Sequence, residues 1–320
     1  MKVLITGGGG FLGFYIAKLL IKENFQVVSF SRSKYEKLTQ LGVEQISGDL
    51  QNKNQIMTAL TGVDAVIHTA SKVGMNGSYN DFFHTNFIGT KNLVDSMKEM
   101  GVKRLIFTST PSVVFGKDDI VNGDESLPYP NHFLTYYAQT KKMAEEYVLS
   151  NCDEHFFALS LRPHLIFGPG DQNLIPRVVE ASKKGKLKIV GDGENKVDII
   201  YVENAAVAHL LALKKVGPSL SKKAYFIGQG PVKLWNFTNQ VLIHYGLPPI
   251  KKKISLPLAY AIGAIIEFGL KAFRLHHIHP PMSRFIALQL GKSHYFNHHN
   301  SIKDLGNYQI TSIEEAISKL

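Results

Sequence analysis

The feature that most constrains the fold is a glycine-rich turn between an apolar run and a helical pattern. Gly7, Gly10 and Gly13 follow the apolar residues 3–5, and a helical pattern occupies residues 12–21. A tight turn needs residues without Cβ, and the free N–H groups at the start of a helix favour a pyrophosphate. The sequence therefore predicts a dinucleotide-binding strand, loop and helix, and a merely mobile glycine turn is the weaker interpretation.

Short β-rich runs alternate with helical patterns through the first half of the chain. The β-rich runs are residues 3–5, 27–30, 65–68, 105–108 and 156–161, and further helical character covers residues 83–97. This alternation is typical of an α/β fold with a Rossmann-like, doubly wound parallel sheet. We predict an NAD(P)-binding Rossmann domain with the catalytic residues over residues 1–168. Residues 169–320 should form mainly a smaller C-terminal substrate-binding cap, with some segments returning to the core.

The composition favours a folded protein of a reducing compartment. Of the 320 residues 44% are hydrophobic, and the single cysteine, Cys152, permits neither an intrachain disulfide nor a cysteine-based metal site. The first residues have the pattern of a strand and not of a signal peptide, so we expect a cytoplasmic protein. The net charge of +10 suits an anionic ligand or a membrane surface. Nucleic acid is the weakest interpretation, because no basic motif with interleaved aromatic residues is present.

A tyrosine and a lysine four residues apart give the strongest indication of chemistry. Tyr137 and Lys141 should share one face of a helix. A tyrosine with an ordinary pKa of about 10 transfers protons poorly at neutral pH, but a neighbouring ammonium favours its phenolate; lowering the pKa to ~7 takes about 4 kcal/mol. Beside a nucleotide-binding loop, the pair predicts hydride transfer to or from a nicotinamide, with Tyr137 moving the proton.

The end of the second predicted strand indicates which nicotinamide cofactor binds. An NAD-preferring site usually carries an acidic residue there to hold the ribose diol. This chain has Ser31 and Arg32 instead, and an arginine can pair with a 2′-phosphate, so NADP(H) is favoured over NAD(H). Four further positions at later strand ends are expected to line the path of the cofactor: Asp49, Leu50, Ala70 and Ser71.

A run of hydroxyl residues follows the fifth predicted strand, at the edge where open α/β sheets bind ligands. Catalysis needs one hydroxyl that holds the substrate oxygen within reach of Tyr137. Thr110 is the first candidate, and Ser109 and Ser112 are the alternatives. Such runs are more often turn residues, and only the presence of Tyr137 and Lys141 favours catalysis here.

The chain resembles the extended short-chain dehydrogenase/reductase superfamily over nearly its whole length. The motifs that carry the resemblance are TGGGGFLG, TNFIGTKNL, TSTPSVVFG, YYAQTKKMAEE and LRPHLIFGPGD. The stretch from Asn195 to Ala212 is similar to the 3β-hydroxysteroid dehydrogenase branch, which includes sterol-4α-carboxylate 3-dehydrogenases and 2-alkyl-3-oxoalkanoate reductases. Because the acidic NAD residue is absent, the likeness tilts toward the reductases.

The resemblance implies a four-residue active site. Tyr137 would donate or accept the proton, Lys141 would bind the ribose and tune Tyr137, and Thr110 would orient the substrate oxygen. Asn86 would support Lys141 through water or backbone, and Pro163 would flank the nicotinamide. The glycine loop would contribute cofactor contacts from Gly7, Gly10, Phe11, Leu12 and Gly13.

The resemblance also implies a homodimer formed through two helices, one of which carries Tyr137. The reaction implied is the interconversion of a secondary alcohol and a ketone in steroid or lipid metabolism. The substrate would be bulky and apolar, a sterol or a 2-alkyl-3-oxoalkanoate, and the apolar residues 254–273 and 285–290 suit such a ligand.

Two other functions remain open at this point. A sugar-nucleotide epimerase or dehydratase shares the same Tyr and Lys, but Val197 stands where an arginine that grips the diphosphate is expected, with Arg177 as a substitute. A nucleotide-sensing protein without catalysis is the other, and the retention of Tyr137 and Lys141 argues against it.

The apolar segment 256–273 is almost long enough to span a bilayer. It contains Glu267 and Lys271, and each charge near a helix centre costs about 2.5–3.5 kcal/mol. We therefore expect a buried or interfacial helix, either closing the cap or making peripheral membrane contact beside Lys251–Lys253. No metal site is expected, because His68, His84, His164 and His209 form no compact set and His276, His277 and His279 suit a loop.

Overall fold

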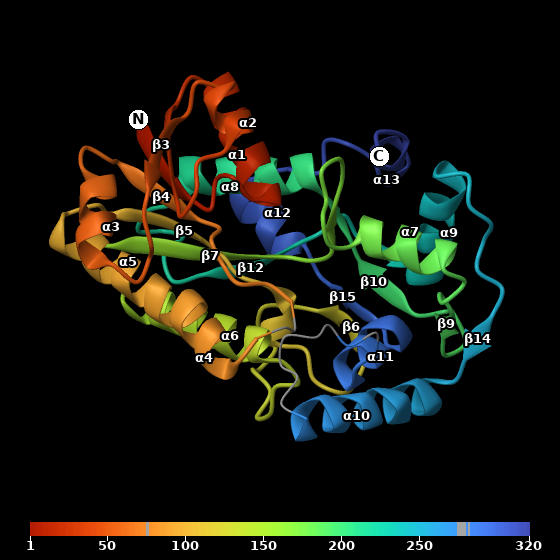
Figure 1. The fold of residues 1–320 in the computed structure, drawn as a ribbon. Coiled ribbons are helices and arrows are strands. Elements are labelled where there is room, and N and C mark those ends of the chain that lie inside the picture. Colours follow the sequence, from red (N-terminus) through yellow and green to blue (C-terminus); the bar gives the residue numbers. More distant parts are fainter. Residues whose placement is uncertain (75–76, 274–279, 281) are drawn as a thin grey trace.

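The main layer of the fold is a sheet of seven parallel strands, ordered β12-β7-β5-β4-β1-β2-β3 (Figure 1). The computed structural model describes the whole chain except residues 75–76, 274–279 and 281, so the predicted histidine loop lies outside the described residues. In chain order the strands are β1 (Lys2–Thr6), β2 (Gln26–Ser31), β3 (Glu44–Ser47), β4 (Ala65–His68), β5 (Arg104–Thr108), β7 (Phe157–Pro163) and β12 (Ala224–Ile227). The predicted Rossmann-like α/β fold is confirmed, and the strand order reverses between β1 and β4, where such sheets bind ligands.

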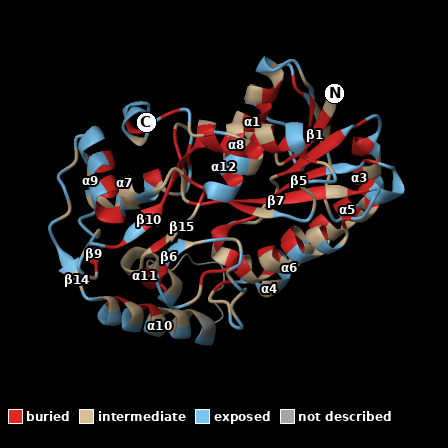
Figure 2. Ribbon diagram, turned by 180° about the vertical axis from the view of Figure 1, so that it is seen from behind, coloured by how far each residue is buried: buried red, intermediate tan, exposed pale blue. Residues whose placement is uncertain are grey.

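Helices cover both faces of this sheet. On one face lie α1 (Phe11–Lys22), α8 (Val202–Lys215) and α12 (His299–Leu305), and on the other α3 (Lys53–Leu60), α5 (Gly89–Glu99) and α6 (Tyr136–Ser150) (Figure 1). Because successive strand residues point to opposite faces, Val3 and Ile5 pack in one core and Leu4 in the other. Figure 2 shows the strands as a buried layer between helices whose outer faces are exposed.

The helix predicted over residues 83–97 is built from three pieces. They are α4 (Tyr79–Phe82), the π-helix η1 (Phe83–Ile88) and α5. Ser78 caps the first piece in a capping box with Asp81. The wider π turn holds Asn86 in a buried position, and π turns of this kind are frequent at functional sites.

A smaller mixed sheet, ordered β13-β10-β15-β6, forms the centre of the C-terminal part. Its strands are β6 (Ile120–Gly123), β10 (Lys196–Asp198), β13 (Pro231–Lys233) and β15 (His294–Phe296). The two halves of the chain exchange strands, because β6 joins this sheet and β12 joins the main one. The domain division at residue 168 stays a prediction.

The remaining elements are short strand pairs and helices around the smaller sheet. The pairs are β8 (Ile166–Phe167) with β11 (Ile200–Tyr201), and β9 (Ile189–Val190) with β14 (Lys253–Ile254). The helices of the C-terminal part are α7 (Ile175–Lys183), α9 (Leu234–His244), α10 (Leu256–Ala272), α11 (Arg284–Gly291) and α13 (Ile313–Ser318), and the first half adds α2 (Glu36–Thr39) and the 3₁₀-helix η2 (Pro111–Val113). Within the described ranges, no helix is both long and apolar enough to cross a membrane.

A buried ion pair ties α6 to β7. Arg162 donates to Glu145 from Nη2 to Oε1 at 2.6 Å and from Nε to Oε2 at 3.1 Å. The hydroxyls of Ser160 and Tyr129 donate to the same carboxylate at 2.6 and 2.7 Å. Burial by itself raises the pKa of Glu145, but Arg162 and the hydroxyl donors outweigh burial, so this pKa lies below its usual range. The carboxylate therefore stays charged inside the core.

Replacing Arg162 by methionine should lower the free energy of unfolding by about 3–5 kcal/mol, because Glu145 is then buried without its partner. Urea denaturation at neutral pH measures the loss. The matched control is Lys98→Met, which removes the exposed pair with Asp153 and should cost no more than ~1 kcal/mol.

The cost of Arg162→Met should also depend on pH. Since the folded pKa of Glu145 is depressed, the stabilisation is fully present above the unfolded pKa of about 4.3 and is lost as the pH falls through the lower folded value. The difference between wild type and Arg162→Met should shrink in that range. Equal losses for Arg162→Met and Lys98→Met at neutral pH would contradict the role of the pair.

Candidate active site

The glycine turn between β1 and α1 leaves no room for side chains. Gly7 has a φ of +73°, which glycine adopts without strain, and a Cβ there would lie 2.9 Å from Ala70 Cα. A Cβ on Gly13 would lie 2.3 Å from the carbonyl oxygen of Gly7. Helix α1 begins at Phe11, so its first N–H groups have no partner within the helix. The turn therefore fits a dinucleotide, because backbone and helix end can approach a pyrophosphate closely.

A groove of about 340 Å³ opens beside this turn, where β1, β2, β3 and β4 end. Eight predicted cofactor residues line it: Gly7, Gly10, Ser31, Arg32, Asp49, Leu50, Ala70 and Ser71. The other predicted contacts are not among its lining residues: Phe11, Leu12, Gly13, Tyr137, Lys141 and Pro163. The prediction missed seven lining residues, of which five had a usable signal because they directly adjoin predicted cofactor residues: Phe30, Ser33, Gly48, Gln51 and Thr69, with Tyr35 and Thr85 as the other two.

The groove continues at Arg32 into a second hollow of about 470 Å³. Arg32 and Ser71 line both spaces, and Lys72 adds a second cation to the hollow. Asp81 also lines it, but its carboxylate accepts a hydrogen bond from Ser78 N at 2.8 Å as part of the helix cap. No acidic residue follows directly after β2, so the edge of the groove has a cationic character that suits a phosphate.

Tyr137 and Thr110 are brought together by the structure. Tyr137 lies in the first turn of α6, and its hydroxyl is close enough to the Thr110 side chain for Thr110 to affect its pKa. Ser112 Oγ accepts a hydrogen bond from Thr110 Oγ1 at 3.2 Å, and Ser109 Oγ is buried without a partner among the described residues. Among the three candidate hydroxyls, this arrangement favours Thr110 as the partner of Tyr137.

Lys141 points toward the main sheet from the next turn of α6. Its Nζ donates to the carbonyl oxygen of Thr108 at 2.6 Å and lies 4.0 Å from the ring centre of Phe107. The side chain is buried, and burial lowers the pKa of Lys141 to about 7, although the charge of Glu145 opposes this shift. Burial therefore makes the amine easier to deprotonate than an exposed lysine.

The ionisation of Tyr137 differs from the sequence-based expectation. Burial raises the pKa of Tyr137 to about 12, the Thr110 side chain opposes the rise, and Lys141 is not among the groups that shift it. The physical reason is that desolvation disfavours the phenolate, while the ammonium of Lys141 is directed at Thr108. At neutral pH Tyr137 is a protonated phenol, the form that donates a proton.

Asn86 joins the loop after β4 to α6. Its Oδ1 accepts from Lys72 N at 2.7 Å, and its Nδ2 donates to Lys72 O at 3.1 Å and to Thr140 Oγ1 at 3.1 Å. Thr140 directly precedes Lys141, so this bond joins Asn86 to the same turn of α6 that carries the lysine. The support for Lys141 that the resemblance implies remains a prediction.

His68 is a buried neutral side chain close to Lys141. Its ring nitrogens lie 2.5 Å from Thr6 Oγ1 and 2.8 Å from Thr90 Oγ1. Thr90 donates its own hydroxyl to Asn86 O at 2.6 Å, so Nε2 of His68 must donate to Thr90 and Nδ1 must accept from Thr6. Burial, and next the charge of Lys141, lower the pKa of His68 to about 3.

His209 of α8 holds Thr108 from the other side of the sheet. Its Nδ1 donates to Ala205 O at 2.7 Å, so its Nε2 must accept from Thr108 Oγ1 at 2.9 Å. Burial lowers the pKa of His209 to about 4. The strand end that receives the Lys141 amine is thus fixed by a second neutral histidine.

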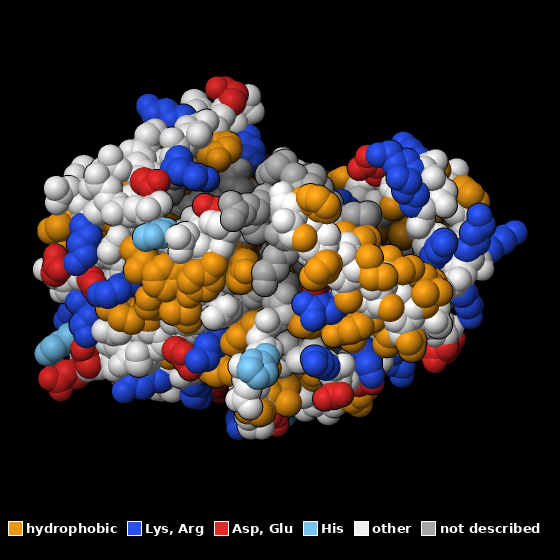
Figure 3. Space-filling model, turned by 60° about the horizontal axis from the view of Figure 1, so that its bottom comes forward, with side chains coloured by type: hydrophobic (Ala, Val, Ile, Leu, Met, Phe, Trp, Pro, Cys, Tyr) orange, Lys and Arg blue, Asp and Glu red, His pale blue; other side chains and the backbone are white. Residues whose placement is uncertain are grey.

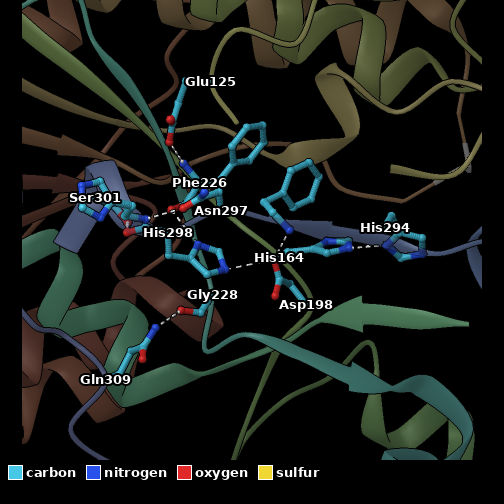
Figure 4. Close-up of polar contacts among 12 residues, drawn as sticks. Glu125, His164, Asp198, Phe226, Gly228, His294, Asn297, His298, Ser301 and Gln309 are labelled. Atoms are coloured by element: carbon cyan, nitrogen blue, oxygen red, sulfur yellow. Dashed lines mark hydrogen bonds and ion pairs between the residues drawn. The ribbon is translucent and has the colours of Figure 1, made fainter. Parts of the chain in front are cut away.

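An ion pair that the sequence did not reveal lies where the two sheets meet (Figure 4). His298 Nε2 lies 3.0 Å from Asp198 Oδ2, and its Nδ1 lies 3.2 Å from Phe226 O. Both partners are acceptors, so both ring nitrogens carry protons and His298 is a cation. Burial lowers the pKa of His298, but Asp198 outweighs burial and the pKa is raised. The nearest signal was Asp198 within the motif that resembles the 3β-hydroxysteroid dehydrogenase branch.

Two histidines contact each other beside this ion pair, and one of them, His164, directly follows β7 (Figure 4). His164 Nε2 lies 2.6 Å from His294 Nδ1, and His294 Nε2 donates to Gln289 O at 2.9 Å. His164 must therefore donate to His294, and burial lowers the pKa of both rings. These bonds fix the segment after Pro163 against β15 and α11. Within the described part of the chain, no group of three or more His, Cys, Asp or Glu side chains is placed to hold a metal ion.

Comparison with known proteins assigns the family. The model of the 3-beta hydroxysteroid dehydrogenase/isomerase family matches residues 4–258. The chain belongs to this family. It is therefore an NAD(P)-dependent oxidoreductase that acts on CH–OH groups, within the extended short-chain dehydrogenase/reductase superfamily that the sequence motifs predicted.

Similar members of the 3-beta hydroxysteroid dehydrogenase/isomerase family come from bacteria and mammals. The 2-alkyl-3-oxoalkanoate reductase of Stenotrophomonas maltophilia (strain K279a) is 42% identical over 100% of this chain and 98% of its own length. The enzyme of the same name from Shewanella oneidensis is 40% identical over 99% of this chain and 84% of its own. The decarboxylating sterol-4-alpha-carboxylate 3-dehydrogenase of Mus musculus is 33% identical over 99% of this chain and 89% of its own length.

Solved structures share the fold at lower identity. The crystal structure of gox2253 has a TM-score of 0.81 at 23% identity and covers 99% of this chain and 96% of its own. The UDP-glucuronic acid 4-epimerase of Bacillus cereus in complex with NAD has a TM-score of 0.77 at 19% identity, and the match covers 100% of this chain and 97% of the epimerase chain. At these identities the likeness speaks for the fold alone.

Replacing Thr110 by alanine should lower kcat by roughly 10²-fold, because Tyr137 loses its neighbouring hydroxyl. The control is Ser109→Ala, which removes a buried hydroxyl without a partner among the described residues and should leave kcat nearly unchanged. Steady-state kinetics of the three proteins measure the effect. A larger loss for Ser109→Ala than for Thr110→Ala would transfer the role to Ser109.

Proposed function

We propose that this protein is an NADPH-dependent reductase of 2-alkyl-3-oxoalkanoates, which reduces the ketone to a secondary alcohol. The observation that carries the proposal is the closeness of the protonated Tyr137 to Thr110, with the buried Lys141 one turn further along α6. Identities of 42% and 40% to reductases of this name support the substrate class, against 33% to the murine sterol dehydrogenase.

The cofactor would be held by the groove at the ends of β1 to β4. The glycine turn and the start of α1 would take the pyrophosphate, Asp49 and Leu50 the adenine side, and Ala70 and Ser71 the path toward Tyr137. When bound, NADPH supplies the hydride that reduces the carbonyl carbon. Lys141 would bind the ribose hydroxyls, and Pro163 would flank the nicotinamide.

Tyr137 would supply the proton of the reaction. Thr110 and Tyr137 would both bond the ketone oxygen, and the Tyr137 proton would move to that oxygen as the carbonyl carbon gains the hydride. One hydride and one proton convert the ketone to the alcohol, and the phenolate left behind regains its proton from solvent. A phenol whose pKa is raised to about 12 is fully protonated at neutral pH, which supports the reductive direction.

The preference for NADPH rests on Arg32. Arg32 lines both the groove and the hollow beside it, and Lys72 adds positive charge there. A guanidinium can pair with a 2′-phosphate through two hydrogen bonds, whereas the ribose diol of NADH has no carboxylate to bond at the end of β2.

A packed apolar cluster follows the hydroxyl run and would give the substrate site an apolar wall. Val113 and Phe115, which follow Thr110, pack with Leu288 of α11 and Phe296 of β15, and Phe285 contacts Phe115 edge to face. A sterol would suit the same cluster and is the second candidate, supported by the sterol dehydrogenases among the relatives. The epimerase alternative is weaker, because Val197 lies fully buried in β10 and cannot grip a diphosphate.

We further propose a homodimer through α6 and the helical segment formed by α4, η1 and α5. Apolar side chains gather over α4 and α6 on the face seen in Figure 3, and Tyr136 there is 49% exposed. A row of aromatic rings connects the two helical segments. Tyr79 of α4 stacks on Phe83, Phe83 contacts Phe87, and Phe87 contacts Tyr147 of α6. Sedimentation of the purified protein as a monomer would refute this assembly.

The substrate is tested by NADPH oxidation with a 2-alkyl-3-oxoalkanoate, a 3-ketosteroid and a nucleotide sugar. We expect turnover of the oxoalkanoate, and Tyr137→Phe should lower its kcat by about 10³-fold while NADPH still binds. Higher turnover of the 3-ketosteroid would favour the sterol candidate. Unchanged turnover in Tyr137→Phe would remove the tyrosine from the mechanism.

Replacing Arg32 by alanine should raise the Kd of NADPH about tenfold or more, because a charge-assisted pair is lost, and should leave the Kd of NADH unchanged. Fluorescence titration of both cofactors measures the two constants. Arg104→Ala is the matched control, since Arg104 lies exposed at the start of β5, the opposite edge of the sheet. An equal rise in the Kd of NADPH and of NADH would show that Arg32 does not bind the 2′-phosphate.

A further inference from the structure

Helix α10 presents an apolar face to solvent along its length. Leu258, Ile262, Ile265 and Phe268 are 54%, 36%, 72% and 75% exposed, and their spacing of three or four residues places them on one side of the helix. Figure 3 shows a broad apolar area over this helix with basic side chains at its margins. The outer face of a surface helix normally carries charged and polar residues, so this face has the pattern of a contact surface.

The opposite side of α10 is fixed against α11. Gly263 approaches α11 so closely that a Cβ would lie 2.4 Å from the carbonyl carbon of Ser283. Glu267 is the single acidic residue of the helix. Its carboxylate accepts hydrogen bonds from Arg284 Nε at 2.6 Å and from the Arg284 backbone N at 2.8 Å. The orientation of the helix is thus set by packing and by an ion pair, and the apolar face is held outward.

Basic residues flank the apolar face at both ends. Lys251 and Lys252 precede the helix, are exposed, and form no ion pair within the part of the chain that the structure describes. At the other end, Lys271 is the second-last residue of α10. Basic residues that frame an apolar stripe suit a surface of negative charge above an apolar interior.

We propose that α10 docks on the surface of a bilayer that contains anionic lipid, with its axis in the headgroup plane and its exposed side chains among the acyl chains. A second copy of the chain fits this face less well, because antiparallel pairing of two α10 helices sets the basic end of one against the basic end of the other. Lipid phosphates complement both ends at once. The helix lies on the bilayer and does not cross it, since 17 residues rise only about 25 Å and charges stand at both ends.

Vesicle co-sedimentation tests the proposal without any turnover, so its outcome is independent of the proposed reaction. The full-length protein is mixed with vesicles of phosphatidylcholine alone or of equal parts phosphatidylcholine and phosphatidylglycerol. We expect binding to the mixed vesicles that weakens with salt. Ile265→Asp with Phe268→Asp should weaken this binding at least about tenfold, because both side chains lose their apolar contact and add negative charge.

Two controls separate docking from general effects. Ile243→Asp changes an apolar side chain of α9 that is 62% exposed, and it should bind the mixed vesicles like wild type. Lys251→Ser with Lys252→Ser should lower the affinity for the mixed vesicles about fivefold per lysine and leave binding to phosphatidylcholine vesicles unchanged. Unchanged NADPH binding and thermal unfolding in each variant would show that the fold is kept.

Three results would overturn the proposal. The first is equal sedimentation of wild type with and without mixed vesicles. The second is retained binding in the Ile265→Asp, Phe268→Asp variant. The third is an oligomer of the wild type that forms without lipid and is absent in this variant, while neither protein binds vesicles. That result would make the face a contact between copies of the chain.

Discussion

The burial of the Lys141 amine under the end of the main sheet is the constraint on which the candidate site depends. A cation removed from water must be stabilised locally, and the Thr108 carbonyl, the Phe107 ring and the charge of Glu145 do so. Burial still lowers the pKa of this amine to about 7. Burial lowers the pKa of His68 and of His209, the two histidines beside this strand end, and the charge of Lys141 lowers that of His68 further.

The surroundings of Lys141 form one connected set of fixed proton positions. Thr6, His68, Thr90 and Asn86 are joined by hydrogen bonds from β1 to the π-helix, and His209 holds Thr108 on the far side of the sheet. Each donor in this set has one acceptor, so the ends of β1, β4 and β5 are held in one arrangement. The glycine groove, Tyr137 and Thr110 all lie at those same strand ends, which is how the fold brings cofactor and proton donor to one edge.

Much of this arrangement could be predicted from the sequence. The parallel sheet followed from the alternation of β-rich and helical patterns, and the groove residues Arg32, Asp49 and Ala70 followed from their positions at strand ends. The ionisation of Tyr137 could not be predicted, because it depends on how deeply α6 buries the phenol and where the Lys141 amine points. The pairs His298–Asp198 and His164–His294 likewise join residues far apart in sequence, for which no local pattern exists.

By itself, the sequence determined which chemical groups exist and which local elements carry them: a glycine turn that favours a dinucleotide, a Tyr and Lys on one helix face, and an apolar segment over residues 256–273. Only the tertiary structure showed how burial shifts the pKa values, which of the neighbouring hydroxyls lies near Tyr137, and that apolar side chains of α10 face outward. The reason is physical. Residue type and spacing fix local conformation, whereas desolvation, hydrogen-bond direction and exposure are set by contacts between distant segments.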